Sequence, residues 1–169
     1  MRARSRLSAL AERIAPLGWH IQIYASISVL AAIAPSLAEL LVPVVLDHYA
    51  MAKASHGAGQ PDLAPVLQAV GDGHAYVKLS APYRISQQAP DYLDVQAIAR
   101  AYIDANPDRI LWASDWPHTN RIAGRAAHDV TPFKDIDDRA VLRAFRSWVN
   151  DSALQEKIFT RNPARLYRF

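Results

Sequence analysis

Four polar side chains follow short apolar segments of the sequence, each at the point where its segment ends. Tyr24 ends the run WHIQIY, His48 follows VVLD, Arg84 follows KLSAPY, and Asp115 follows ILWAS. A carboxylate and an imidazole can move protons, while a guanidinium can bind a carboxylate through two parallel hydrogen bonds. These four residues are therefore the first candidates for a site that binds an anionic molecule and moves protons on it.

Asp115 is the strongest candidate for the catalytic acid or base. It lies between Ser114 and Trp116, directly after an apolar segment, which suits a carboxylate at the mouth of a sheet. An aspartate after a strand can equally be a helix N-cap. His118 follows Asp115 by three residues, and we expect it to be a second polar group at the rim that contacts the substrate.

The roles of His48 and Arg84 stay open from the residues alone. His48 could bind a metal, donate a hydrogen bond to a substrate oxygen or orient a water molecule, although a single histidine at a strand end is more often structural. Arg84 follows a proline-restricted turn and could hold a substrate carboxylate, or it could pair with a nearby aspartate at the surface. Tyr24 shares its strand face with His20 and Gln22, and its place at the strand end favours the site.

Apolar segments alternate with helical patterns along the chain. The expected strands cover 19–24, 44–46, 75–80 and 109–113, and the expected helices include 30–41, 62–70, 138–149 and 152–160. Strand ends at Tyr24, His48, Ser80 and Asp115 recur at βα-unit spacing, which predicts an α/β fold with about four parallel strands and a helical C-terminus. Residues after parallel strands gather at one end of the sheet, so the four candidates should converge.

Composition excludes several classes of protein. The 169 residues carry a net charge of +3 with no concentrated basic stripe, which argues against nucleic acid as a partner. The apolar stretch 27–46 is interrupted by Pro35, Glu39 and Pro43, so we expect no membrane span. The absence of cysteine excludes thiolate chemistry and fits a cytoplasmic protein.

The segment ILWASDWPH (110–118) resembles the last-strand motif of the amidohydrolase-related family. Three further segments resemble that family in the expected order, and so does the chain end; these are GWHIQIY (18–24), VPVVLDH (42–48), KLSAPYR (78–84) and RNPARLYRF (161–169). The resemblance covers nearly the whole chain. It implies a partial (β/α)8 barrel, of the TIM barrel type.

Within the family, the pattern is most similar to the 2-pyrone-4,6-dicarboxylate lactonases. That resemblance implies that Asp115 activates water, that His48 and Tyr24 contact a small anionic substrate, and that Arg84 takes a carboxylate. It also implies that no metal is required, whereas most of the superfamily binds one. If a divalent metal such as zinc or manganese is bound, His48 and Asp115 are its expected ligands.

The sequence departs from the family in one large respect. Family members open with an H-x-H pair after the first barrel strand, and this sequence contains no H-x-H. A complete barrel needs roughly 250 residues, so we interpret residues 1–169 as one domain that lacks the N-terminal part of the barrel. Two alternatives to lactone hydrolysis stay open: a catalytically silent half-barrel that associates with itself or a partner through its open sheet edges, and a metal-dependent decarboxylase.

Overall fold

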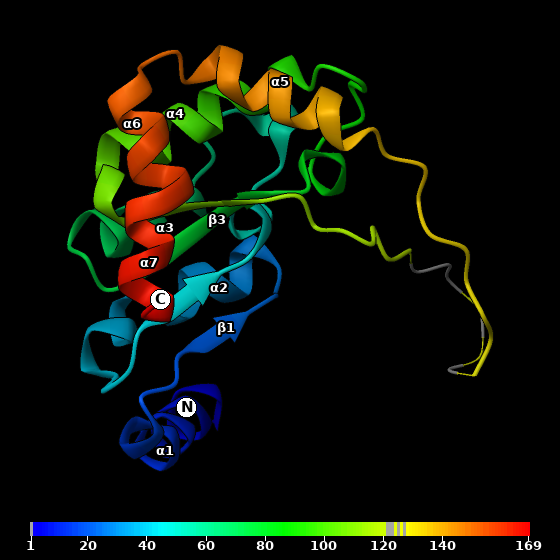
Figure 1. Ribbon diagram of the computed structural model, residues 1–169. Coiled ribbons are helices and arrows are strands. Elements are labelled where there is room, and N and C mark those ends of the chain that lie inside the picture. The colour runs from blue at the N-terminus through cyan, green and yellow to red at the C-terminus, as the bar shows by residue number, and fades with distance from the viewer. Residues whose placement is uncertain (1, 121–123, 125, 127) are drawn as a thin grey trace.

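A four-stranded parallel sheet organises the chain (Figure 1), and its strands lie in sequence order. The computed structural model describes residues 2–120, 124, 126 and 128–169. The strands are β1 (Ile21–Ile23), β2 (Val44–Leu46), β3 (Tyr76–Ser80) and β4 (Ile110–Ala113). Each strand is parallel to the next, with Ile21 opposite Val44, Val45 opposite Tyr76, and Val77 opposite Ile110. The predicted parallel sheet is therefore confirmed.

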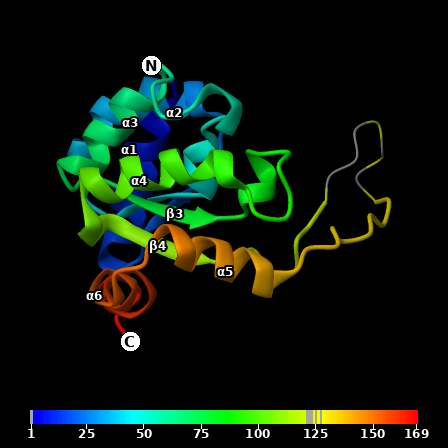
Figure 2. The same ribbon diagram turned by 90° about the horizontal axis from the view of Figure 1, so that it is seen from above.

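Helices connect the strands, and among the described residues three further α-helices follow β4. The α-helices are α1 (Arg2–Ile14), α2 (Ile27–Ile33), α3 (Leu63–Gly71), α4 (Gln96–Ala105), α5 (Asp138–Trp148), α6 (Ser152–Glu156) and α7 (Asn162–Tyr167). Seen from above (Figure 2), α3 and α4 lie beside β3, and α5 lies beside β4. The buried apolar residues of these three helices belong to one core. Repeated βα units followed by helices form a partial (β/α)8 barrel, as the sequence predicted. In the described part of the chain, no helix is long and apolar enough to cross a membrane.

The two faces of the sheet pack against different helices because side chains alternate along a strand. Val44, Leu46 and Val77 belong to the main core, which also contains the apolar residues of α2, α3 and α4. Val45 and Leu111 point to the opposite face, where Leu166 of α7 covers them in a second small cluster. The main core thus fixes the strands, and α7 seals part of the other face.

Beside this second cluster, the sheet carries a polar network. Nζ of Lys78 lies 3.0 Å from Oδ1 of Asp47 and donates to Oε1 of Gln22 at 2.9 Å. Nε2 of Gln22 donates to Oδ2 of Asp47 at 2.8 Å. These groups come from β1, β3 and the residue after β2, so the network joins the strands just below their carboxyl ends.

The structure differs from two of the predicted helices, and proline explains the first difference. The predicted helix over 30–41 ends at Ile33, and a 3-10 turn over Ala34–Glu39 follows. Pro35 has no amide hydrogen, and its ring clashes with the preceding turn of an α-helix. The predicted last helix over 152–160 is instead α6, a π-helical turn over Lys157–Arg161, and α7, which begins just before Pro163.

Asn162 ties α7 to the sheet and provides a test of this packing. Its buried Nδ2 donates to the carbonyl oxygens of Pro107 at 2.8 Å and Ile110 at 2.7 Å. Asn162→Ala leaves both carbonyls without this donor, so we expect the free energy of unfolding to fall by about 2–4 kcal/mol. Urea denaturation measures it, with Asn150→Ala at an exposed position as the control. Equal losses in the two variants would contradict this role.

Candidate active site

The backbone takes an unusual conformation within two residues of the end of three of the strands. His48 follows β2, Ala81 follows β3 and Asp115 follows β4, with φ angles of 53°, 52° and 71°. This left-handed region costs residues other than glycine on the order of 1–3 kcal/mol each. The packed sheet holds these residues in place, and the turns direct their neighbours' side chains across the carboxyl ends of the strands.

Asp115 lies at the centre of the candidate site, and its two carboxylate oxygens have different surroundings. Oδ2 accepts hydrogen bonds from the Tyr83 hydroxyl at 2.5 Å and from Nε of Arg84 at 2.8 Å, and Nη2 of Arg84 also lies 2.8 Å away. Oδ1 lies 3.7 Å from Nε2 of His48, which is too long for a hydrogen bond. Among the described residues, Oδ1 therefore has no hydrogen-bond partner.

Arg84 is held by protein groups on more than one side. Besides Asp115, its Nη2 contacts the backbone oxygen of Thr119 at 3.2 Å. Burial alone would lower the pKa of Arg84, but the hydrogen bond and charge of Asp115 outweigh burial and raise that pKa. The guanidinium is thus a fixed positive charge beside Asp115. The sequence left open whether Arg84 pairs with a nearby aspartate, and its partner is the central aspartate of the site.

His48 faces Asp115 from the turn after β2. Its Nδ1 lies 2.9 Å from Oγ of Ser80, and the side chain is buried. Burial is the largest cause that lowers the pKa of His48; the charges of Asp115 and Asp47 oppose that shift without cancelling it. The ring is therefore neutral at pH 7, and when Ser80 donates to Nδ1, Nε2 carries the proton and points toward Asp115.

Tyr24 forms the exposed wall of the candidate site. Its ring meets the His48 ring edge-on at a centroid distance of 5.2 Å, and the guanidinium carbon of Arg84 lies 5.9 Å from the Tyr24 ring centroid. The side chain is 59% exposed, so a bound molecule can reach it. The structure thus brings together Tyr24, His48, Arg84 and Asp115.

Tyr83 belongs to the candidate site although the sequence did not single it out. Its hydroxyl joins Asp115 to Nδ1 of His118, which lies 3.1 Å away. His118 is buried, not at the rim, and its Nε2 lies 3.2 Å from Oδ1 of Asp138. The sequence feature that could have indicated Tyr83 is its place between Pro82 and Arg84. The turn there directs the side chains of Tyr83 and Arg84 toward Asp115.

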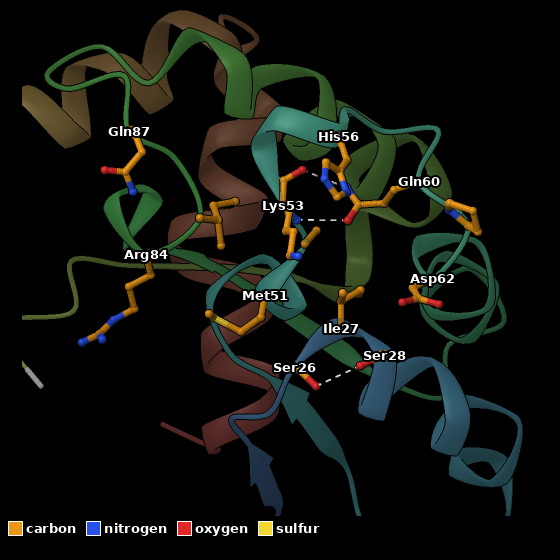
Figure 3. A pocket seen from close by; sticks show the side chains of 13 residues that line it. Ser26, Ile27, Ser28, Met51, Lys53, His56, Gln60, Asp62, Arg84 and Gln87 are labelled. Carbon is orange, nitrogen blue, oxygen red and sulfur yellow. Dashed lines mark hydrogen bonds between the residues drawn. The ribbon is translucent and has the colours of Figure 1, made fainter. Parts of the chain in front are cut away.

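A cleft of about 500 Å³ borders the site on the side of Arg84 (Figure 3). Its walls come from the loops after β1, β2 and β3, and include Ser26, Ser28, Met51, Lys53, His56, Gln60, Asp62, Arg84 and Gln87. In Figure 3, the Arg84 side chain extends away from Met51 and Lys53, so its stem forms the boundary of the cleft. This volume lies within the range of small-molecule sites, roughly 300–1,000 Å³.

The donors in the described part of the chain do not make up a metal site. No group of three or more His, Asp or Glu side chains converges there. His48 and Asp115 supply two donors, whereas a catalytic zinc site usually takes three protein ligands. The Arg84 guanidinium also occupies the side of Asp115 that a cation would share. The described residues therefore do not by themselves fit a catalytic metal ion.

The family of the chain is clear from its match to known proteins. The model of the amidohydrolase family matches residues 2–169, so the chain belongs to that family.

Two curated relatives and one solved structure are similar to it. The 2-pyrone-4,6-dicarboxylate hydrolase of Comamonas testosteroni is 31% identical over 97% of the chain and 53% of its own length. The 4-sulfomuconolactone hydrolase of Hydrogenophaga intermedia is 28% identical over 89% and 47%. A probable 2-pyrone-4,6-dicarboxylic acid hydrolase of Acinetobacter baumannii, solved with citric acid bound, superposes with a TM-score of 0.77 at 24% identity, over 95% of this chain and 57% of that one. The chain spans about half the length of these curated relatives.

The lowered pKa of His48 gives a prediction for pH. We expect the His48 ring to titrate below its ordinary value of about 6.5. The unfolded chain then binds more protons than the folded chain below that pH, so stability should fall as the pH drops from about 6.5 toward the folded pKa. Asp115→Asn should lower the His48 pKa further, because the Asp115 charge raises it.

NMR titration of the ring protons measures this directly, with His48→Gln to assign the signal. A His48 midpoint above 6.5, or one that rises in Asp115→Asn, would contradict the arrangement described for the site.

Proposed function

We propose that this chain carries the catalytic base of a hydrolase that opens the lactone ring of a small anionic substrate. The observation that carries the proposal is the Asp115 carboxylate. Its Oδ2 is bound by Tyr83 and Arg84, and its Oδ1 has no hydrogen-bond partner among the described residues and lies beside a neutral His48. Such an arrangement suits general-base activation of water. The lactone hydrolases among its relatives support the same reaction class.

In the proposed mechanism, Oδ1 of Asp115 takes a proton from water as the water oxygen attacks the lactone carbonyl carbon. The carbonyl electron pair moves to oxygen, and Nε2–H of His48 donates a hydrogen bond to that oxygen. When the ring C–O bond breaks, Asp115 returns the proton to the leaving oxygen. The products are a carboxylic acid, which ionises at neutral pH, and a hydroxyl group.

The charges around Asp115 favour an anionic substrate. Arg84 is a partly buried positive charge beside the exposed ring of Tyr24, and Lys53 lines the neighbouring cleft. The names of the two curated relatives specify a dicarboxylate lactone and a sulfonated lactone, both of which carry negative charge at neutral pH. We therefore propose that a substrate carboxylate or sulfonate lies against Arg84 and Tyr24.

Asp115→Asn tests the proposed base. The substitution keeps the side-chain volume but removes the base, so we expect kcat for lactone hydrolysis to fall by about 10²–10⁴-fold. Hydrolysis of 2-pyrone-4,6-dicarboxylate, followed spectrophotometrically, measures the loss, and circular dichroism verifies the fold. Asp104→Asn, at an exposed aspartate outside the site, is the matched control and should keep full activity.

Turnover by Asp115→Asn equal to that of the wild type would remove Asp115 from the mechanism. Metal analysis of the same preparations addresses the decarboxylase alternative. Stoichiometric zinc or manganese, together with carbon dioxide release that a chelator abolishes, would replace lactone hydrolysis by metal-dependent decarboxylation.

A second candidate function, self-association, follows from the open sheet. Among the described residues, β1 pairs with β2 and β4 pairs with β3, so the outer edges of β1 and β4 have unpaired backbone groups. Four strands are half of an eight-stranded barrel. A second copy related by a two-fold axis could place its β1 beside β4, and its β4 beside β1, which would close the ring with all strands parallel.

Light scattering after size-exclusion chromatography tests this association. If two copies close the barrel, the measured mass should be twice the chain mass of 18.7 kDa and should fall toward that value on dilution. A folded monomer at every concentration would exclude self-association, and hydrolysis by that monomer would show that the described half of the site suffices.

A further inference from the structure

A chain of four side chains runs from the candidate base to the molecular surface. Asp115 follows β4, Tyr83 lies in the 3-10 turn after β3, His118 lies three residues beyond Asp115, and Asp138 begins α5. Successive members are 2.5, 3.1 and 3.2 Å apart. Of these residues, only Asp115 takes part in the proposed mechanism. The contacts from Tyr83 to His118 and from His118 to Asp138 therefore have another role.

The number of donor protons determines the direction of the hydrogen bonds among Asp115, Tyr83 and His118. The Tyr83 hydroxyl has one proton, and the short contact to the ionised Asp115 takes it. The contact between Tyr83 and Nδ1 of His118 then needs a proton on Nδ1, so His118 donates to the Tyr83 oxygen. These two hydrogen bonds thus point toward the Asp115 carboxylate, whereas Nε2 of His118 and Oδ1 of Asp138 lie 3.2 Å apart without a hydrogen bond.

We propose that Tyr83 is a positioning residue for Asp115, and that His118 holds Tyr83 in place through its Nδ1. By fixing Oδ2, Tyr83 keeps Oδ1 directed toward His48 and the incoming water. The catalytic consequence of this inference rests on the proposed function, whereas the arrangement itself does not. It assigns His118 a supporting role, since both of its ring nitrogens face protein groups.

The backbone around His118 favours a built arrangement over a chance contact. His118 has a φ of 57°, which costs energy for a residue other than glycine. Its amide donates to the carbonyl oxygen of Asp115 at 2.8 Å, and its own carbonyl oxygen accepts from the amide of Lys134 at 2.9 Å. The segment that leads to α5 therefore returns to the site and places Asp138 beside the ring.

Tyr83→Phe removes the hydroxyl and little else. We expect kcat to fall by about 10–100-fold because Asp115 loses its fixed orientation, while KM stays within about twofold because Tyr83 is not proposed to touch substrate. Tyr92→Phe is the matched control at another buried tyrosine and should keep full activity. A rise in KM with unchanged kcat would overturn the positioning role.

Substitutions of His118 separate positioning from packing. Asparagine can place an amide donor near the position of Nδ1, whereas leucine offers similar bulk without a donor. We expect His118→Asn to retain at least about tenfold more kcat than His118→Leu. Equal kcat values in two variants with the same thermal stability would show that His118 acts only through packing.

An NMR measurement keeps this inference separate from the proposed function. The Tyr83 hydroxyl proton, protected by its short hydrogen bond, should give a slowly exchanging downfield signal that Tyr83→Phe removes and His118→Leu weakens. If the wild type shows this signal but hydrolyses no lactone, the proposed function fails and the arrangement stands. If the signal is absent from the folded wild type, the arrangement is wrong whatever the activity.

Discussion

The candidate site depends on one interaction, the ionised carboxylate of Asp115 held by the Tyr83 hydroxyl and the Arg84 guanidinium. A half-buried negative charge is costly unless it is paired and hydrogen-bonded. Here Tyr83 and Arg84, which follow β3, provide the hydrogen bond and the opposite charge, both at Oδ2 of Asp115. Oδ1 faces His48. The asymmetry that makes Asp115 useful as a base is therefore the same asymmetry that stabilises its charge.

That interaction can form only if the sheet holds the ends of β3 and β4 side by side. Lys78 lies opposite Leu111, and Ser80 lies opposite Ala113, so the strands leave the sheet in register. The left-handed residues Ala81 and Asp115 then turn each chain across the end of its strand. Their unfavourable backbone conformations are offset by the packing below them, where Leu79 and Ile110 are fully buried in the main core.

The sequence predicted those parts of the fold that depend on local pattern. Apolar runs located the four strands, and their spacing predicted the parallel order, because both follow from residue types near one another in the chain. The break at Pro35 was present in the sequence, but the helical apolar pattern beyond it obscured the change to a 3-10 turn. The position of His118 could not be predicted, because Asp138, twenty residues further on, returns to contact it through a segment without a periodic pattern.

The polar network below the site links the chemistry of His48 to the open face of the sheet. Lys78 and Asp47 act on the pKa of His48 in opposite directions, and they lie 3.0 Å from each other. Asp47 raises that pKa more than Lys78 lowers it, and burial is the largest cause of the net lowering. Anything that covers this face, whether further barrel strands or a second copy, would remove water from the Lys78–Asp47 pair and strengthen the attraction between its charges. Closure of the barrel would also deepen the burial that keeps His48 neutral.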